Sequence, residues 1–208
     1  MHIDAVTISI DYSDYLDKIA SNNKVLDRWL IVTHELDKKT INVCNKHKLE
    51  YIFSERIYDN DVFFAKSRAI NEGLQYIKPK EWILHIDSDT LLPKDFKSIM
   101  ESIDLDKHSI YGADRVHETN GLIEQNSMSS TGFPWGYLQL WHADEFKSYY
   151  EKGMIDTQGD YEHADQFNTS SQLPFTVTDV QNVEEKNWSG RSLLTRARHM
   201  ILNSRNIH

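Results

Sequence analysis

Two acidic residues, Asp87 and Asp89, flank Ser88 directly after the short apolar segment 82–86. A segment of this length is more typical of a buried central strand than of a helix. Two carboxylates at positions i and i+2 of a non-helical turn can share a divalent cation, and their hard oxygen atoms suit Mg²⁺ or Mn²⁺. Such an ion commonly brings phosphate oxygens with it. The alternative is an ordinary solvated turn, because the Asp-x-Asp tripeptide is common.

The flanking sequence narrows this choice. Leu91, Leu92 and Pro93 follow the acidic pair, and Pro93 is a natural first residue of a helix. Upstream, residues 66–74 read Lys-Ser-Arg-Ala-Ile-Asn-Glu-Gly-Leu. Together these features resemble the GT-A glycosyltransferases, in particular the large inverting family 2, in which an A-x-N-x-G-L helix precedes an apolar strand that ends in D-x-D. The resemblance covers about residues 3–145 well and the rest more loosely.

This resemblance implies a fold, a reaction and a cofactor. The fold is an α/β, Rossmann-like GT-A domain, with a mostly parallel sheet flanked by helices and a smaller mixed portion on the acceptor side. The reaction is the transfer of a sugar from a nucleotide diphosphate sugar, UDP-linked by preference, to an acceptor hydroxyl with inversion. The cofactor is Mn²⁺ or Mg²⁺, held by Asp89, with Asp87 binding it directly or through water or ribose.

The resemblance also implies donor-binding residues in the first half of the chain. Besides the acidic pair and Ser88, they are Ser9, Asp11, Thr33, His34, Lys66 and Arg68. The family usually has consecutive Asp residues where this chain has Thr33-His34-Glu35, so the contact to the base differs here. Lys66 and Arg68 are expected to contact the base or the diphosphate, and their alternative is a solvated basic face. Asp11 has the alternative of a simple turn residue.

A second acid-rich segment lies at residues 156–167. In the resembled family, acids at this point of the chain supply the general base that deprotonates the acceptor. The usual Glu-Asp pair appears here as Glu162-His163, with Asp165 two residues further on. We expect the base to be Asp165, then Glu162, then His163, in that order. The alternative is that all three form the first turn of a helix, where the helix dipole stabilises acids.

The C-terminal segment carries the last implied contact. It contains Asn187-Trp188-Ser189-Gly190-Arg191, an ending that also occurs in relatives, and Arg191 is expected to reach a diphosphate oxygen. Many relatives have a histidine just before this motif that completes the metal site, whereas this chain has Gln181 and Val183 in that region. Residues 153–185 hold seven acids and no Lys or Arg, and residues 186–208 hold five Lys or Arg and no acid. A docked C-terminal helix that balances those acids is therefore an alternative, and weak attraction to an anionic membrane is another.

The elements that must position these residues alternate along the first half of the chain. Strands are expected at 5–10, 29–33, 49–53 and 82–86, and helices after Ser13 or Asp14, over 38–48 and over 61–76. This β-α alternation predicts a parallel sheet with right-handed crossovers. The ends of its strands then bring Ser9, Asp11, Thr33, His34 and the acidic pair to one edge, where ligands bind in such sheets.

The second half is less regular. Strands are expected at 109–115, 136–141 and 174–180, with a hairpin turn at Asn120-Gly121 and a helix starting at His142. Trp135, Tyr137 and Trp141 can pack against a sugar ring, and their alternative is ordinary core packing. We expect one domain over residues 1–208, with the nucleotide-binding half at 1–105 and the acceptor half with the C-terminal helix at 106–208.

Composition limits the remaining classes. A net charge of −9 argues against nucleic-acid binding. The single cysteine, Cys44, rules out an internal disulfide, and no apolar run approaches the length of a membrane span, so we expect a cytoplasmic protein with at most peripheral membrane contact. The alternative functions are a nucleotidyltransferase, which would want a glycine-rich loop after the first strand that Ile8–Ser13 lacks, and a non-catalytic nucleotide- or carbohydrate-binding module.

Overall fold

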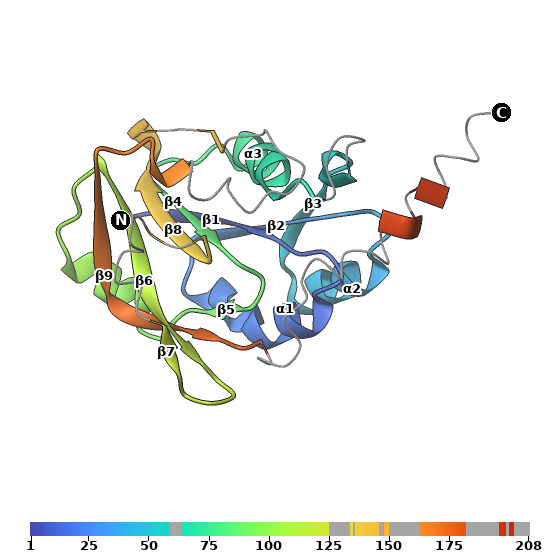
Figure 1. Cartoon of the computed structure of the whole chain (residues 1–208), viewed down its shortest axis with the longest axis horizontal. Helices are drawn as coiled ribbons and strands as arrows, with labels where there is room; N and C mark the ends of the chain where they lie inside the picture. Colours follow the sequence, from blue (N-terminus) through green and yellow to red (C-terminus); the bar gives the residue numbers. More distant parts are fainter. Residues whose placement is uncertain are drawn as a thin grey trace.

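The computed structural model describes residues 1–58, 64–124, 134, 136–145, 148–149, 163–181, 196–198 and 200–201. Its strands form one curled sheet in the order β3-β2-β1-β4-β8-β6-β9-β5, with β7 paired to β6 (Figure 1). Helices cover both faces, which is the layered arrangement expected for an α/β domain. In the described part of the chain, no helix is long and apolar enough to cross a membrane.

The first half of the chain forms the parallel part of the sheet. Its strands are β1 (Ile3–Ile8), β2 (Arg28–Thr33), β3 (Glu50–Phe53) and β4 (Trp82–Ile86). The connecting helical elements are α1 (Ser13–Ile19), η1 (Ala20–Lys24), α2 (Lys38–His47), η2 (Arg56–Tyr58) and α3 (Lys66–Ile77). β1 pairs in parallel with both β2 and β4, and β2 pairs in parallel with β3. The parallel sheet predicted from the alternating pattern is thereby confirmed.

The second half adds the mixed part of the sheet. It contains β5 (Thr90–Leu91), α4 (Phe96–Ser102), β6 (Ser109–His117), β7 (Ile123–Glu124), β8 (Leu138–His142), η3 (Ala143–Glu145) and β9 (Thr169–Asp179). β8 lies antiparallel to β4, and β9 runs parallel to β6 and antiparallel to β5. The hairpin between β6 and β7 turns at Gly121, whose φ of 66° is one that glycine adopts without strain.

The core has a layer on each side of the sheet. α1, α2 and α4 bury Leu16, Cys44 and Phe96 on one face, and α3 buries Ile70 and Leu74 on the other. Figure 1 shows α3 on the opposite side of the parallel strands from α1 and α2. β1, β4 and most of β2 are buried on both faces, which explains why these strands are nearly continuous apolar segments.

Several local expectations are corrected. α1 is capped by Tyr12 without a side-chain hydrogen bond, so neither Ser13 nor Asp14 caps it. α3 begins at Lys66, although the apolar residues Phe64 and Ala65 made an earlier start plausible; both are buried ahead of the helix. Pro93 does not start a helix: β5 follows the acidic pair, and α4 begins only at Phe96. The helix expected from His142 is the single turn η3, because β8 extends through His142.

Gly73 is the point of closest approach between α3 and the sheet. A Cβ atom at this position would stand 2.8 Å from Cγ1 of Val6 and 2.9 Å from Cγ2 of Val32. We therefore expect Gly73→Ala to lower the free energy of unfolding by about 1–3 kcal/mol, although alanine is the better helix former. Urea denaturation measures this change, with Gln75→Ala at an exposed position of α3 as the control. A Gly73→Ala variant as stable as the wild type would show that α3 can move away from β1 and β2.

Candidate functional site at the carboxyl edge of the parallel strands

The parallel strands bring the predicted donor-binding residues to one edge of the sheet. Ser9 directly follows β1, and Thr33 is the last residue of β2. The backbone N–H of Ser9 donates to the carbonyl of Val32 over 3.0 Å. Asp87 follows β4, and its backbone N–H donates to the carbonyl of Tyr137 over 3.0 Å. Because β1 is paired on either side with β2 and β4, the ends of all three strands meet here. The juxtaposition expected from the sequence is present.

Asp87 is held by a lysine from the neighbouring helix. Nζ of Lys66 lies 2.9 Å from Oδ1 of Asp87, and it also lies 3.5 Å from the carbonyl oxygen of Gly136. The imidazole of His85, two residues earlier on β4, places Nε2 at 3.8 Å from the same carboxylate oxygen. Burial lowers the pKa of His85 well below its usual range, and the charge of Lys66 adds to this effect. His85 is therefore a neutral group behind the carboxylate.

Asp89 has a different environment from Asp87. The residue as a whole is partly exposed, but Oδ1 is buried and accepts no hydrogen bond in the described part of the chain. Burial, and after it the charges of Asp87 and Asp179, raise the pKa of Asp89 from 3.8 to about 7, against a smaller opposing effect of Arg115. A buried carboxylate oxygen without a partner is costly. A cation would satisfy it, so the donor set fits a hard divalent ion.

Asp179 is a neighbour of this site that the sequence analysis missed. It ends β9 opposite Thr90 of β5, and it is 3% exposed. Its Oδ2 lies 2.8 Å from Nδ1 of His117 and 3.8 Å from Nη1 of Arg115. Its Oδ1 accepts a hydrogen bond from the backbone N–H of Gln181 over 2.8 Å. The signal available in the sequence was its position as an acid near the end of the expected last strand.

Among the described residues, Asp87 and Asp89 are the candidates for holding a divalent ion. Among the residues that the structure describes, no three His, Cys, Asp or Glu side chains are grouped so that they could hold a metal. Asp179 is engaged with His117 and Arg115, as described above. A divalent ion at Asp87 and Asp89 would complete its coordination with water and phosphate oxygens, which such ions readily accept.

The ends of β1 and β2 form the other side of the site. Asp11 has a φ of 57°, and its backbone N–H donates to Oδ2 of Asp37 over 2.6 Å. The Asp37 carboxylate also caps α2 through the backbone N–H and the hydroxyl of Thr40. His34 is 1% exposed, and its ring centroid lies 5.4 Å from that of Tyr58. Asp37 thus fixes Asp11, and Tyr58 fixes His34, at the edge of the sheet where the nucleotide base is expected to bind.

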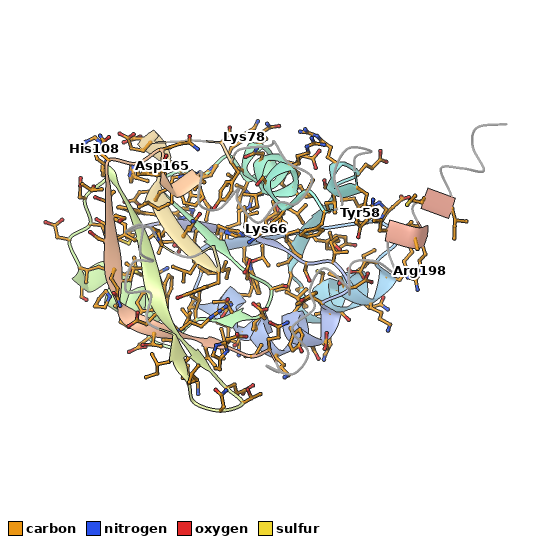
Figure 2. All side chains as sticks on the ribbon, in the orientation of Figure 1. Tyr58, Lys66, Lys78, His108, Asp165 and Arg198 are labelled. Atoms are coloured by element: carbon orange, nitrogen blue, oxygen red, sulfur yellow. The ribbon has the colours of Figure 1, made fainter. Side chains whose placement is uncertain are left out.

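The two basic residues of α3 differ in their placement. Lys66 occupies the first position of the helix and reaches Asp87. Arg68 is two residues further on, about 200° around the helix axis from Lys66. Of the two, the structure brings Lys66 to the acidic pair. Figure 2 shows Lys66 near the middle of the molecule, with Tyr58 to its right in this view.

The architecture is shared with known structures. The mannosyl-3-phosphoglycerate synthase of Rubrobacter xylanophilus matches with a TM-score of 0.56 and 14% identity, over 100% of this chain and 76% of that one. The glucosyl-3-phosphoglycerate synthase of Mycobacterium tuberculosis, in complex with phosphoglyceric acid, matches with a TM-score of 0.58 and 10% identity, over 95% and 79%. The inositol-1-phosphate CTP transferase of T. maritima matches with a TM-score of 0.54 and 12% identity, over 95% and 96%. This chain has a GT-A fold.

At these identities the likeness establishes the GT-A fold alone. Comparison of the sequence with protein-family models gives no match, and comparison with curated proteins gives none either. The function therefore has to be argued from this chain's own residues.

Two of the three candidates for the general base, His163 and Asp165, lie among the described residues. His163 is fully buried, stacked on the ring of Tyr149 at 4.0 Å and 4.5 Å from that of Trp141. Asp165 is exposed, and it lies four residues before the start of β9. β9 has 11 residues and reaches Asp179 only at its far end. Figure 2 accordingly shows Asp165 well separated from Lys66.

The remaining expected site residues and the aromatic residues expected to contact a sugar have different outcomes. Glu162, Arg191 and Trp135 lie outside the described residues. Tyr137 and Trp141 are 5% and 0% exposed, so they pack in the core and present no face to a sugar. The hydroxyl of Tyr149 donates to Oε1 of Gln139 over 2.6 Å. Trp141 and Tyr149 pack in the core layer on the α3 side of the sheet, and Tyr137 packs in the layer on the opposite face.

Asn71 ties the A-x-N-x-G-L helix to this packing. Its side-chain amide donates to the carbonyl of Tyr149 over 2.9 Å and accepts from the backbone N–H of Tyr149 over 2.8 Å. A buried amide that satisfies both backbone groups of one residue fixes the chain segment there. The asparagine of this motif is therefore structural, and Lys66 at the start of the same helix is the residue that reaches the site.

Proposed function

We propose that the chain is a metal-dependent glycosyltransferase that moves a sugar from a UDP-sugar to an acceptor hydroxyl with inversion. The observation that carries the proposal is Oδ1 of the Asp89 carboxylate, which is buried and has no hydrogen-bond partner among the described residues, next to Asp87 at the carboxyl end of β4. An anionic pair at this edge of a GT-A fold is suited to a cation and the diphosphate that comes with it.

The known relatives in fold support this choice of ligand. The glucosyl-3-phosphoglycerate synthase of M. tuberculosis has been solved with Mn²⁺ and UDP-glucose, and also with Mg²⁺ and UDP. Asp87 and Asp89 would hold the ion in this chain. Once bound, a divalent ion neutralises the charge that develops on the leaving nucleoside diphosphate.

The protein's own residues would divide the remaining work. Ser9, Asp11 and His34 stand where the nucleoside is expected, with Asp11 fixed by Asp37. Lys66 contacts Asp87, and from this position its ammonium group would reach the diphosphate. Arg68 and Arg191 remain proposed phosphate contacts. In a one-step displacement with inversion, a carboxylate from the segment 156–165 would accept the acceptor's hydroxyl proton.

The test is binding of UDP followed by thermal unfolding, with Mn²⁺ and with EDTA. A ligand that binds only the folded state stabilises it by about 2.7 kcal/mol at a concentration one hundred times its Kd. We expect UDP and UDP-sugars to raise the melting temperature in Mn²⁺ and to lose most of this effect in EDTA. Equal stabilisation in Mn²⁺ and EDTA would contradict the metal site.

A nucleotidyltransferase is the second candidate, because the inositol-1-phosphate CTP transferase of T. maritima shares the fold. Against it, the turn after β1 contains no glycine that would cradle a triphosphate. Release of pyrophosphate from CTP or UTP in the presence of a sugar phosphate would favour this candidate. Nucleotide binding without turnover of any donor would instead identify a binding module.

A further inference from the structure

The ammonium group of Lys66 lies beside Asp87, at the position where a bound divalent cation would be expected. The ammonium lies 2.9 Å from Oδ1 of Asp87, and the Lys66 side chain is only 15% exposed. A lysine this well covered is not a freely solvated group on a helix flank. Its charge neutralises Asp87, while Oδ1 of Asp89 is buried and accepts no hydrogen bond from the described residues.

We propose that Lys66 is an internal substitute for the divalent cation: it neutralises Asp87 in the nucleotide-free protein and must leave Asp87 when the ion binds. This inference rests on the proposed function, because it concerns the same metal and nucleotide. It goes beyond that function by assigning Lys66 two successive partners. In its first position Lys66 contacts Asp87, and in its second it contacts the diphosphate.

Electrostatics requires such an exchange. An ammonium and a divalent ion repel each other, and the repulsion is strong in a covered site where the effective dielectric constant is low. An ion that arrives alone must displace Lys66 from Asp87 and breaks this ion pair without bringing a new anionic group for the ammonium. An ion that arrives with a nucleoside diphosphate brings new anionic oxygens, and the flexible lysine stem can turn to them.

The consequence is that the ion and the nucleotide bind cooperatively. The metal alone binds weakly because Lys66 competes with it, and the metal–nucleotide complex binds well because Lys66 then has a phosphate partner. His85 remains behind Asp87 throughout, with Nε2 at 3.8 Å from Oδ1. A neutral imidazole in this place does not add to the repulsion against the incoming ion.

Lys66→Met tests the inference through two measurements that should change in opposite directions. Binding of Mn²⁺ without nucleotide, followed by the electron paramagnetic resonance signal of free Mn²⁺, should become tighter by about tenfold, the order expected for the loss of one competing charge in a partly covered site. Binding of UDP at saturating Mn²⁺, followed by calorimetry, should become weaker by about tenfold, as expected for the loss of one charged phosphate contact.

The controls separate this role from a structural one. Lys66→Arg keeps the charge and should keep the weak binding of Mn²⁺ alone. Lys78→Met removes a lysine at the opposite end of α3, where the side chain is exposed, and should change neither measurement (Figure 2). A permanent structural ion pair predicts that Lys66→Met weakens both Mn²⁺ and UDP binding, and this outcome would overturn the inference.

The result also remains separate from the proposed function. If the wild-type protein does not bind UDP in Mn²⁺, the proposed function fails whatever Lys66 does. If the wild type binds UDP and Lys66→Met leaves the affinity for Mn²⁺ alone unchanged, the proposed function stands and the inference about Lys66 fails.

Discussion

Replacement of Asp89 by asparagine is expected to remove most of the Mn²⁺-dependent gain in UDP affinity and to make the ligand-free protein more stable at pH 8. The first effect follows from the loss of an anionic oxygen that a divalent ion would bind. The second follows because the buried Oδ1 of Asp89 has no partner among the described residues, and asparagine carries no charge there. A site built for binding is often a source of instability in the free protein.

The stabilisation by Asp89→Asn depends on pH in a direction that follows from the pKa of Asp89. The pKa of Asp89 is raised from 3.8 to about 7, so the folded state holds the proton more tightly than the unfolded state does. The charged form is thus disfavoured in the fold, and the wild-type protein loses stability as the pH rises from about 4 to about 7. The stabilisation by Asp89→Asn should appear across this interval and be complete above pH 7, at about 2–4 kcal/mol.

Urea denaturation at pH 5 and pH 8 measures the effect, and calorimetry with UDP in Mn²⁺ and EDTA measures the loss of binding. Asp104→Asn, at an exposed acid in the loop between α4 and β6, is the control that removes one charge without relieving burial. An Asp89→Asn variant that is less stable than the wild type at pH 8 would mean that the Asp89 carboxylate has a favourable partner in the free protein.

The parallel half of the fold could be predicted from the sequence because its information is local. Each strand from β1 to β4 is a short apolar segment followed by a helical pattern, and a parallel order with right-handed crossovers follows from that alternation. Asp87 and Asp89 could then be placed, since the carboxyl end of a central strand is the binding edge. The boundaries were less predictable: α3 starts at Lys66 because Phe64 and Ala65 are buried in non-helical backbone.

The second half could not be predicted as well, because its contacts depend on pairings between distant segments. β9 pairs in parallel with β6, which begins 60 residues earlier, and that pairing carries Asp179 to Asp89 and leaves Asp165 near the other end of β9. A motif read along the chain shows the order of its acids but not which end of a long strand they occupy. The contact of Lys66 with Asp87 could likewise not be predicted, because the sequence does not indicate which acid a lysine at the start of a helix will contact.

Among the three candidates for the general base, Glu162→Gln is expected to lower turnover by about 10²-fold or more, and Asp165→Asn to leave it within about twofold of wild type. Asp165→Asn is expected to have a small effect because Asp165 is exposed and is separated from Lys66, as Figure 2 shows. His163 has no exposed surface and is stacked on Tyr149, so it cannot meet an acceptor hydroxyl without repacking. This prediction departs from the order expected from the sequence, which placed Asp165 before Glu162; Glu162 itself lies outside the described residues.

The measurement is UDP release from a UDP-sugar in the presence of an acceptor that carries a hydroxyl group, together with the affinity for UDP in Mn²⁺. A lost base lowers turnover and leaves UDP affinity near wild type, whereas a misfolded site lowers both. His163→Phe keeps a ring against Tyr149 and serves as the packing control. A loss confined to Asp165→Asn would place the acceptor at the start of β9. Full turnover in all three variants would mean that none of these three residues is the base, and the anomeric configuration of the product would then show whether the reaction inverts at all.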